Sequence, residues 1–535
     1  MVLQFQQGNS EDAWNYSSDD LWRSSSIAQH MNIDVSDERT PLLHRIMIPT
    51  AARVSKWTES FYKRTCILNI LPVLLVLIWC SVPIPFDDCE TILCDYSDYI
   101  FPASSIKNGS PTRINFWYFL FWYYGLYNAL ALFLITKLFS IYALNVGPIQ
   151  ILSYNTLLTL LRQKWYPKLL GAKVTFALFW LVSQSIGIAF YYIPIVKTES
   201  VFWVGLTFFT MSMPLAGALI IIHRKRMDRR HRGRIGVLLL SEEAVDPKPF
   251  IRWIPTDLPR LRAPASYRRF LWFCTALAIA LFALIGGEMY AYLFLSTLPH
   301  TPMDAFIYVY SWVGAIYIMD AMTDYILYRK IRSHPLASIF KLYFFMIYFI
   351  FYRNLFARLR SVDQFAIVQL ASFLWVCIYY PFAMTPQVHR CLVRFIGVTL
   401  TYDEYKEKLG RSFYLRNLAE NTTMLGFLCW VNILHFGPNR AAYPYFHMDD
   451  QDGSPYNHNL TVIAALVIWT SELTSAFITR LTFKRVFGHS ITQQAIREFE
   501  RYPEMIIGFV LVMVHVLQNI LLALIKLDFA AGLEK

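Results

Sequence analysis

The sequence predicts an all-α, polytopic integral membrane protein in which about eleven transmembrane helices form one bundle. Three observations favour this fold class. Of the 535 residues, 56% are hydrophobic and only 16% are charged, whereas a soluble globular protein carries about a quarter charged residues. Long apolar runs recur along the chain, each about the length of a bilayer-spanning helix. Aromatic residues make up 17% of the chain, as expected where aromatic belts line both membrane interfaces.

The net charge of +12 does not indicate nucleic-acid binding, because the Lys and Arg residues cluster in loops beside apolar runs. That distribution is the positive-inside pattern of membrane proteins. We therefore expect the lipid bilayer, with anionic lipid at its cytosolic face, to be the partner. No metal ion and no cofactor are expected, because the chain shows neither a metal-binding His/Cys spacing nor a phosphate-binding glycine loop.

Residues 1–60 are polar and Ser-rich, with no apolar period, and are predicted to form a disordered cytosolic tail. Inside this tail, Glu38 precedes the pair Leu42-Leu43. This arrangement resembles the acidic dileucine signal, which sorting adaptors recognise when they deliver membrane proteins to lysosomes or vacuoles. The resemblance implies adaptor proteins as partners and a vacuolar or lysosomal membrane as the location.

The membrane domain is predicted over residues 61–528, with a short C-terminal tail at 529–535. Eleven segments in this domain qualify as spans by length and apolarity. They lie at about 66–86, 114–138, 173–195, 201–222, 270–297, 304–328, 336–357, 364–385, 417–437, 460–479 and 504–527.

The orientation follows from the basic loop after the fourth span, which the positive-inside rule places in the cytosol. Counting from that loop puts the N-terminus in the cytosol and the C-terminus in the lumen. Two large cytosolic loops are predicted, at 223–269 and 386–416, and a short amphipathic helix at 402–408 is expected to lie on the membrane surface. The basic residues, which we also expect to contact anionic lipid, are Arg224, Lys225, Arg226, Arg229, Arg230, Arg232 and Arg234.

The seventh span departs from the pattern because it contains two basic residues, Lys341 and Arg353. A cation inside a bilayer is costly unless it faces a partner or a cavity. We expect this segment to be tilted, partly re-entrant, or lining a polar cavity.

The first luminal loop carries three candidate modification sites. Cys89 and Cys94 lie close together in a polar stretch, and a luminal location would permit a disulfide between them. Asn108 begins an Asn-Gly-Ser sequon in the same loop, so we expect it to be glycosylated.

The most informative residues are Asp320 and Asp324, which lie inside an otherwise apolar span. Being four residues apart, they share one helix face. Asp320 is expected roughly 13 Å inside Arg329, close to the bilayer midplane. Asp324 lies nearer the cytosol, where Arg329 or Lys330 could pair with it.

Three further polar residues are expected at similar depth, namely Glu288, Glu472 and His515. An unpaired carboxylate there costs about 2.5–3.5 kcal/mol, so each must be protonated, paired or hydrated. We expect Glu288, Asp320 and Glu472 to converge on one cavity near the midplane.

These residues favour a transporter or channel, coupled to protons or cations through the buried carboxylates, over an enzyme. Two other classes stay open. A glycosyltransferase-like enzyme would use the acidic first luminal loop, with Asp87 or Asp88 at the floor of a cleft. A non-catalytic scaffold or receptor would form a tightly packed bundle without a polar cavity.

The sorting hypothesis predicts that Leu42→Ala combined with Leu43→Ala redirects the protein away from the vacuole or lysosome. Imaging of a fluorescently tagged protein measures this, with Leu21→Ala in the same tail as the control. Unchanged delivery of the double variant would reject the signal.

Overall fold

The chain is nearly all helical in the residues that the computed structural model describes. These are 49–86, 114–132, 172–214, 216, 265–296, 302–331, 333–356, 362–396, 400–446, 458–527 and 529. In these ranges the β pairing amounts to two isolated bridges, Phe86 with Ile114 and Ile114 with Phe529. The all-α prediction is therefore confirmed for this part of the chain.

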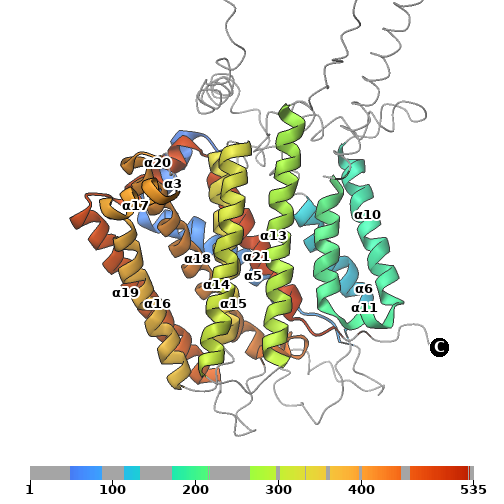
Figure 1. The fold of residues 1–535 in the computed structure, drawn as a ribbon. Coiled ribbons are helices and arrows are strands. Elements are labelled where there is room, and N and C mark those ends of the chain that lie inside the picture. Colours follow the sequence, from blue (N-terminus) through green and yellow to red (C-terminus); the bar gives the residue numbers. More distant parts are fainter. Residues whose placement is uncertain are drawn as a thin grey trace, which may run out of the picture.

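The long helices stand side by side and run roughly along one direction (Figure 1). The amino-terminal third contributes α3 (Ala51–Thr58), α4 (Phe61–Thr65), the π-helix η2 (Cys66–Ile70), α5 (Leu71–Ser81), α6 (Phe116–Tyr118), the π-helix η4 (Phe119–Tyr124), α10 (Ala172–Tyr191) and α11 (Pro194–Thr198). A further helix covers Ser200–Pro214.

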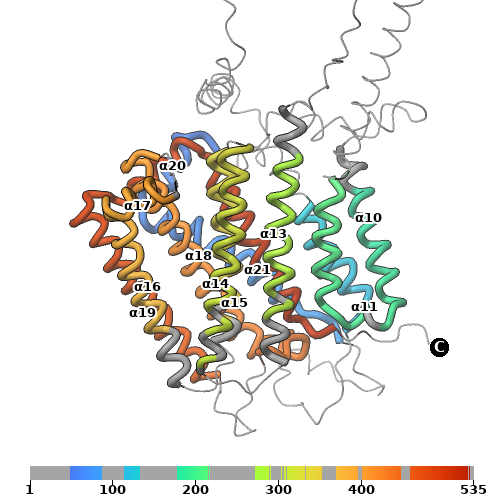
Figure 2. Tube along the Cα trace, in the orientation of Figure 1, coloured from blue at the N-terminus to red at the C-terminus, as the bar shows by residue number. Residues whose placement is uncertain are grey.

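The remaining elements form the larger part of the bundle. They are α13 (Ala265–Ser296), α14 (Pro302–Tyr325), the π-helix η5 (Ile326–Ile331), α15 (His334–Phe356), α16 (Val362–Ala383), α17 (Pro386–Ile396), α18 (Tyr402–Phe436), η6 (Arg440–Ala442), η7 (Pro444–Phe446), α19 (His458–Val486), α20 (Ile491–Arg501) and α21 (Met505–Leu524). In the tube view, α10 and α11 stand on one side of α13, and α16 and α19 stand on the other (Figure 2).

Helix α15 lies at the centre of the bundle, in contact with α13, α14, α18 and α21. Of its apolar window, 83% is buried inside the protein. It is one continuous helix from His334 to Phe356, so of the three alternatives for the seventh span, the re-entrant one is wrong. The polar side chains of a buried helix must find hydrogen-bond or ion-pair partners on the neighbouring helices. The partners of Lys341 and Arg353 therefore have to come from the helices around α15.

Four helical segments are long and apolar enough to cross a membrane by length and composition. They are Phe61–Ser81, His334–Phe351, His458–Val486 and Met505–Leu524. A helix lies at each of the eleven segments that the sequence singles out. The fold is thus compatible with a membrane protein, and the count of eleven spans stays a prediction.

Three amphipathic helices, α3, α17 and α20, gather at one end of the bundle, here called the α20 end (Figure 1). Ser55 Oγ on α3 donates to Glu500 Oε1 on α20 at 2.9 Å. This hydrogen bond joins two helices that are far apart in sequence, α3 and α20, at the α20 end of the bundle.

Residues 386–416, predicted to be a cytosolic loop, form α17 and the first four turns of α18. The short surface helix expected at 402–408 is the start of this 35-residue helix. Thr401 and Glu404 form a capping box there, in which each side chain binds the backbone N–H of the other. Local capping therefore starts α18 well before its apolar stretch begins.

The opposite end is held by Asn439, which is buried. Its amide nitrogen donates to the carbonyl oxygens of Cys80 and Val82, both at 2.7 Å, and its oxygen accepts from the backbone N–H of Ile84 at 2.8 Å. One side chain thereby satisfies backbone groups in the last turn of α5 and just past it, which have no helical partner of their own. This fixes α5 to α18.

Helix α13 comes very close to α14 and α15 at Gly287. A Cβ atom there would lie 2.3 Å from a Phe351 ring atom and 2.8 Å from Trp312, whereas a Cβ at the neighbouring Gly286 would meet Phe282 at 4.0 Å. Gly287→Ala should therefore destabilise the protein by about 1–3 kcal/mol through overpacking. Gly286→Ala, the matched control, should be neutral or stabilising by up to about 1 kcal/mol.

Thermal unfolding of the two purified variants in detergent measures the difference. Equal midpoints for Gly287→Ala and Gly286→Ala would contradict the close approach of α13 to α15.

Candidate functional site

The first buried ion pair lies between α14 and α15. Lys341 Nζ is 2.7 Å from Asp320 Oδ2 and 3.3 Å from Asp324 Oδ2, so both aspartates share one ammonium group. All three side chains are largely buried. The structure therefore brings together the two aspartates that the sequence singles out and one of the two cations of the seventh span.

The second pair lies between α15 and α19. Arg353 donates a hydrogen bond to the Glu472 carboxylate, and only 2% and 4% of the two side chains are exposed. A carboxylate and a guanidinium at that burial are tolerated because each neutralises the other. The second cation of the seventh span thus also has a carboxylate partner.

The two pairs lie at different depths, because Lys341 and Arg353 are twelve residues apart on one helix. At 1.5 Å per residue this separates them by about 18 Å along α15. The single midplane layer that we expected from Asp320 and Glu472 is therefore not what these residues form. Glu288 lies on α13, but its side chain is outside the described residues.

Asp324 does not use the cations that the sequence suggested. Its second partner is Lys408 of α18, at 3.6 Å from Oδ2. Arg329 and Lys330 lie over aromatic rings instead, 5.5 Å from the centroids of Tyr325 and Trp272. The predicted pairing of Asp324 with Arg329 or Lys330 is wrong because the chain turns into η5 after Tyr325, and the helix that starts at Thr401 brings Lys408 to the aspartate.

A third ion pair, which sequence analysis missed, lies between the first two. Arg416 Nη2 is 3.5 Å from Glu420 Oε1, one turn along α18, and both residues are buried. The Arg416 guanidinium also lies over the Phe349 ring of α15, 5.3 Å from its centroid. An Arg and a Glu at i and i+4 in an apolar helix were the available signal, but Arg416 was assigned to a loop, and Glu420, inside the predicted span 417–437, was not singled out.

Two tyrosines lie among the three pairs, Tyr317 exposed and Tyr348 partly buried. Tyr317 of α14 interacts electrostatically with Arg416, Lys341 and Asp320. Tyr348 of α15 interacts with Arg416 and Glu420, and Glu420 in turn with Arg353 and Glu472. We call this connected set the polar column. It consists of Asp324, Lys341, Asp320, Tyr317, Tyr348, Arg416, Glu420, Arg353 and Glu472.

The polar column continues to the α20 end through Arg411. The Arg411 Nε atom donates to both carboxylate oxygens of Glu498 on α20, at 2.8 and 2.9 Å, and its Nη1 atom donates to Tyr328 Oη at 3.2 Å. The Tyr328 ring lies 5.1 Å below Lys408, the partner of Asp324. Helix α20 is therefore linked to the column by one chain of polar contacts.

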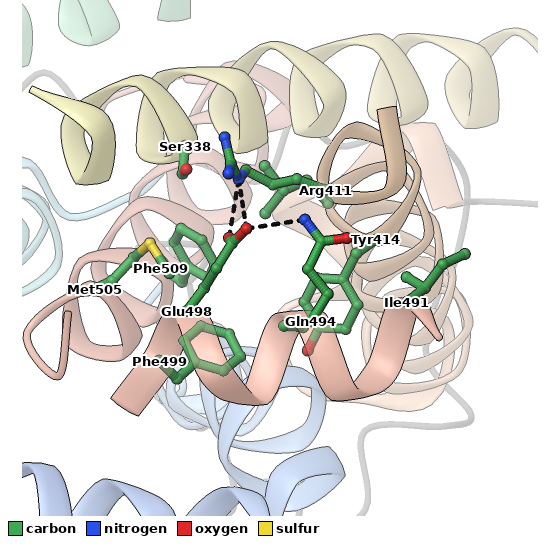
Figure 3. Close-up of a pocket in the computed structure, with 11 residues that line it drawn as sticks. Ser338, Arg411, Tyr414, Ile491, Gln494, Glu498, Phe499, Met505 and Phe509 are labelled. Carbon is green, nitrogen blue, oxygen red and sulfur yellow. Dashed lines mark hydrogen bonds and ion pairs between the residues drawn. The ribbon is translucent and has the colours of Figure 1, made fainter. Parts of the chain in front are cut away.

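Figure 3 shows how Arg411 and Gln494 converge on Glu498 around a small cavity. Gln494 donates to Glu498 Oε1 at 3.0 Å and to the Glu407 carbonyl oxygen at 2.6 Å. The cavity has a volume of about 10 Å³, which is roughly the room that one water molecule needs. Hydrogen bonds between α18 and α20 surround this cavity.

His515, another expected path residue, lies on α21 away from the column. Its Nδ1 atom is 3.3 Å from Tyr127 Oη, and Asn519 Nδ2 lies 3.1 Å from the same atom. Its ring meets Phe208 edge-on. The structure thus groups His515 with aromatic and amide side chains and not with the carboxylates.

Several predicted sites lie outside the described residues and stay predictions. Among the residues that are described, no three His, Cys, Asp or Glu side chains are placed to hold a metal ion. The predicted residues outside these ranges are Glu38, Leu42, Leu43, Asp87, Asp88, Cys89, Cys94, Asn108, Arg224, Lys225, Arg226, Arg229, Arg230, Arg232 and Arg234.

Comparison with known proteins identifies relatives without assigning an activity. Residues 50–525 match the model of a protein family described as SPCC553.12c. A protein of the fission yeast Schizosaccharomyces pombe, named "Uncharacterized protein C553.12c", is 33% identical over 480 residues, which is 89% of this chain and 83% of the relative. No solved structure matches the chain. The matched range contains every residue of the polar column.

A double-mutant cycle tests the second pair. Arg353→Met or Glu472→Met alone should destabilise the protein by about 3–5 kcal/mol, because each leaves an uncompensated buried charge. The double variant should lose much less stability than the sum of the two single-variant losses, because both charges are gone and both side chains are replaced by apolar ones. Thermal unfolding in detergent measures the cycle, and additive losses would argue against a direct pair.

Proposed function

We propose that this chain, which belongs to the SPCC553.12c family, is a multi-pass membrane transporter in which the polar column carries a proton or a cation. The observation that supports the proposal is that four acidic and three basic side chains of α14, α15, α18 and α19 form largely buried ion pairs with one another. Ionisable residues within a membrane bundle characteristically mark ion paths and proton relays.

Stability alone is a weak reason for a chain to contain such residues. Replacing a buried ion pair by apolar residues of similar volume is often neutral or stabilising by about 1–4 kcal/mol. Three such pairs in one bundle, at Lys341, Arg353 and Arg416, are therefore better explained by a function that needs titratable groups.

The pairing at Lys341 suits a relay. Its ammonium group serves two carboxylates, those of Asp320 and Asp324. When one carboxylate takes up a proton, the other still neutralises the lysine, so a proton can enter without leaving a buried charge unpaired. The Arg416–Glu420 and Arg353–Glu472 pairs would continue the path along α15 and α18.

We also propose the membrane location and orientation that the sequence suggests, namely a vacuolar or lysosomal membrane with a cytosolic N-terminus and a luminal C-terminus. The clustering of α3, α17 and α20 at one end supports the orientation, because amphipathic helices lie at a membrane interface. Arg329, Lys330, Lys484 and Arg485 lie in the last turns of η5 and α19, at the same end.

A non-catalytic scaffold or receptor is the second candidate, and one observation favours it. Two cavities in the described part of the bundle have linings that do not include Asp320, Glu420 or Glu472. The smaller one is water-sized, and the larger one, about 410 Å³, is an open and mostly apolar groove between α16 and α19. Paired charges in a close-packed interior would then serve to fix helix register.

Proton flux into proteoliposomes separates the two candidates. In the transporter, Asp320→Asn should reduce flux driven by a pH gradient by about tenfold or more, because an amide cannot take up and release a proton. Asp403→Asn, which removes an exposed carboxylate at the start of α18, is the matched control and should leave the flux unchanged. A folded wild-type protein without flux above that of empty liposomes would favour the scaffold.

A further inference from the structure

Three helices meet at a buried cluster of neutral polar side chains on the α10 side of the bundle (Figure 2). Asn128 lies in the helical residues 125–132 that follow η4. Ser183 lies on α10, and Thr210 lies on the helix Ser200–Pro214. Asn128 Nδ2 donates to Ser183 Oγ at 3.0 Å, and the hydroxyl oxygens of Ser183 and Thr210 are 2.7 Å apart. All three residues have an exposed fraction of 0%, so these hydrogen bonds join the helices in the protein interior.

The hydrogen bonds of this cluster use every hydroxyl proton. Thr210 Oγ1 donates to the Leu206 carbonyl oxygen at 2.7 Å, so the Ser183 hydroxyl must be the donor to Thr210. Ser183 Oγ in turn accepts from Asn128. Each of the three side chains therefore has oxygen lone pairs to offer and no free hydroxyl proton. Asn128 Oδ1 is the clearest case, because it is buried and has no hydrogen-bond partner.

Two neighbouring side chains add buried oxygens without a hydrogen-bond partner. Gln184 follows Ser183 on α10 and is 2% exposed, and neither atom of its amide is hydrogen-bonded. Its Oε1 atom lies 3.3 Å from the position of a Cβ atom at Gly125, three residues before Asn128. Tyr124, one turn before Asn128, is fully buried, and its hydroxyl has no partner. A buried polar atom of this kind costs about 1–3 kcal/mol, and a bound water or ion removes that cost.

Two observations distinguish this cluster from ordinary polar contacts between helices. The buried Asn439 uses both ends of its amide, in three hydrogen bonds to backbone groups, whereas Asn128 uses only its nitrogen. In addition, the π-helix η4 ends at Tyr124, directly before the residues that carry Asn128. Single π-helical turns within α-helices occur frequently at functional sites.

We propose that this cluster binds a sodium ion. Hard cations take oxygen ligands, and calcium and magnesium sites in proteins use carboxylates. None of the side chains here is charged, which favours a monovalent cation. The five oxygens that we assign as ligands are Tyr124 Oη, Asn128 Oδ1, Ser183 Oγ, Gln184 Oε1 and Thr210 Oγ1.

Close packing around the cluster favours sodium over the larger potassium ion. A Cβ atom at Gly125 would lie 2.7 Å from the Leu120 carbonyl oxygen, and one at Gly187 would lie 2.6 Å from the Leu120 side chain. The helices therefore approach each other too closely for a wide ring of ligands. The site lies on helices that contribute no residue to the polar column, and it does not depend on the column carrying anything.

The test is thermal unfolding of the full-length protein in a neutral detergent. Sodium chloride and potassium chloride are titrated separately against choline chloride at constant ionic strength, which keeps charge screening equal. Sodium should raise the unfolding midpoint in a saturable way, because a ligand that binds only the folded state stabilises it. Potassium should have a weaker effect, and choline should have none.

Variants assign the sodium effect to the cluster. Asn128→Leu should weaken the apparent Kd for sodium about tenfold or more, because it removes a ligand oxygen. Asn432→Leu is the matched control, since Asn432 is exposed on α18 and its amide nitrogen donates to the Leu428 carbonyl oxygen of its own helix. If Asn128→Leu does not fold, Thr210→Val removes one oxygen from another helix with little change of shape.

Three results would overturn the proposal. They are a midpoint that responds equally to sodium and choline, equal saturable stabilisation by sodium and potassium, and a sodium effect that Asn128→Leu or Thr210→Val leaves unchanged. The first would assign the unpartnered oxygens to bound water or to helix packing. The second would contradict the choice of sodium, and the third would place the ion elsewhere in the protein.

Discussion

The structure depends on the burial of two cations on its central helix. Lys341 and Arg353 lie on α15, which is surrounded by α13, α14, α18 and α21. Neither could remain in that interior without a carboxylate, so α14 and α19 must supply Asp320, Asp324 and Glu472 at the matching depths. The packing of these helices against α15 and the pairing of their charges therefore constrain each other, and a register change in either helix would leave buried charges unpaired.

Ion pairs made by α18 also link the interior of the bundle to the α20 end. Helix α18 carries Lys408 and Arg411 within one turn, and the first contacts Asp324 while the second contacts Glu498 on α20. A movement of α20 that broke the contact with Glu498 would free Arg411 close to the first ion pair. The amphipathic helix is thus placed to influence the polar column, and it packs against α15, α18 and α21 around the water-sized cavity beside Glu498 (Figure 3).

Sequence periodicity predicted the helices well, because apolar length is a local property. It also singled out Asp320, Asp324 and Glu472, since any charge in an apolar run is conspicuous. Sequence analysis failed to predict which residues pair with each other, because those pairs join residues far apart in the sequence. Asp324 pairs with Lys408, 84 positions later, and nothing local indicates that choice. Arg416 was assigned to a loop because the basic, acidic start of α18 resembles a surface segment, although the capping box at Thr401 and Glu404 marked the helix start. Glu420 lay inside the predicted span 417–437 and was not singled out.

The central claim is that these ion pairs are kept for proton or cation movement and not for stability. The most direct measurement is proton flux in proteoliposomes containing the Arg353→Met, Glu472→Met double variant, together with its unfolding midpoint. The account predicts a folded protein with a midpoint near that of the wild type and with its flux lost, because the pair's titratable groups are gone. A folded double variant with wild-type flux would contradict it.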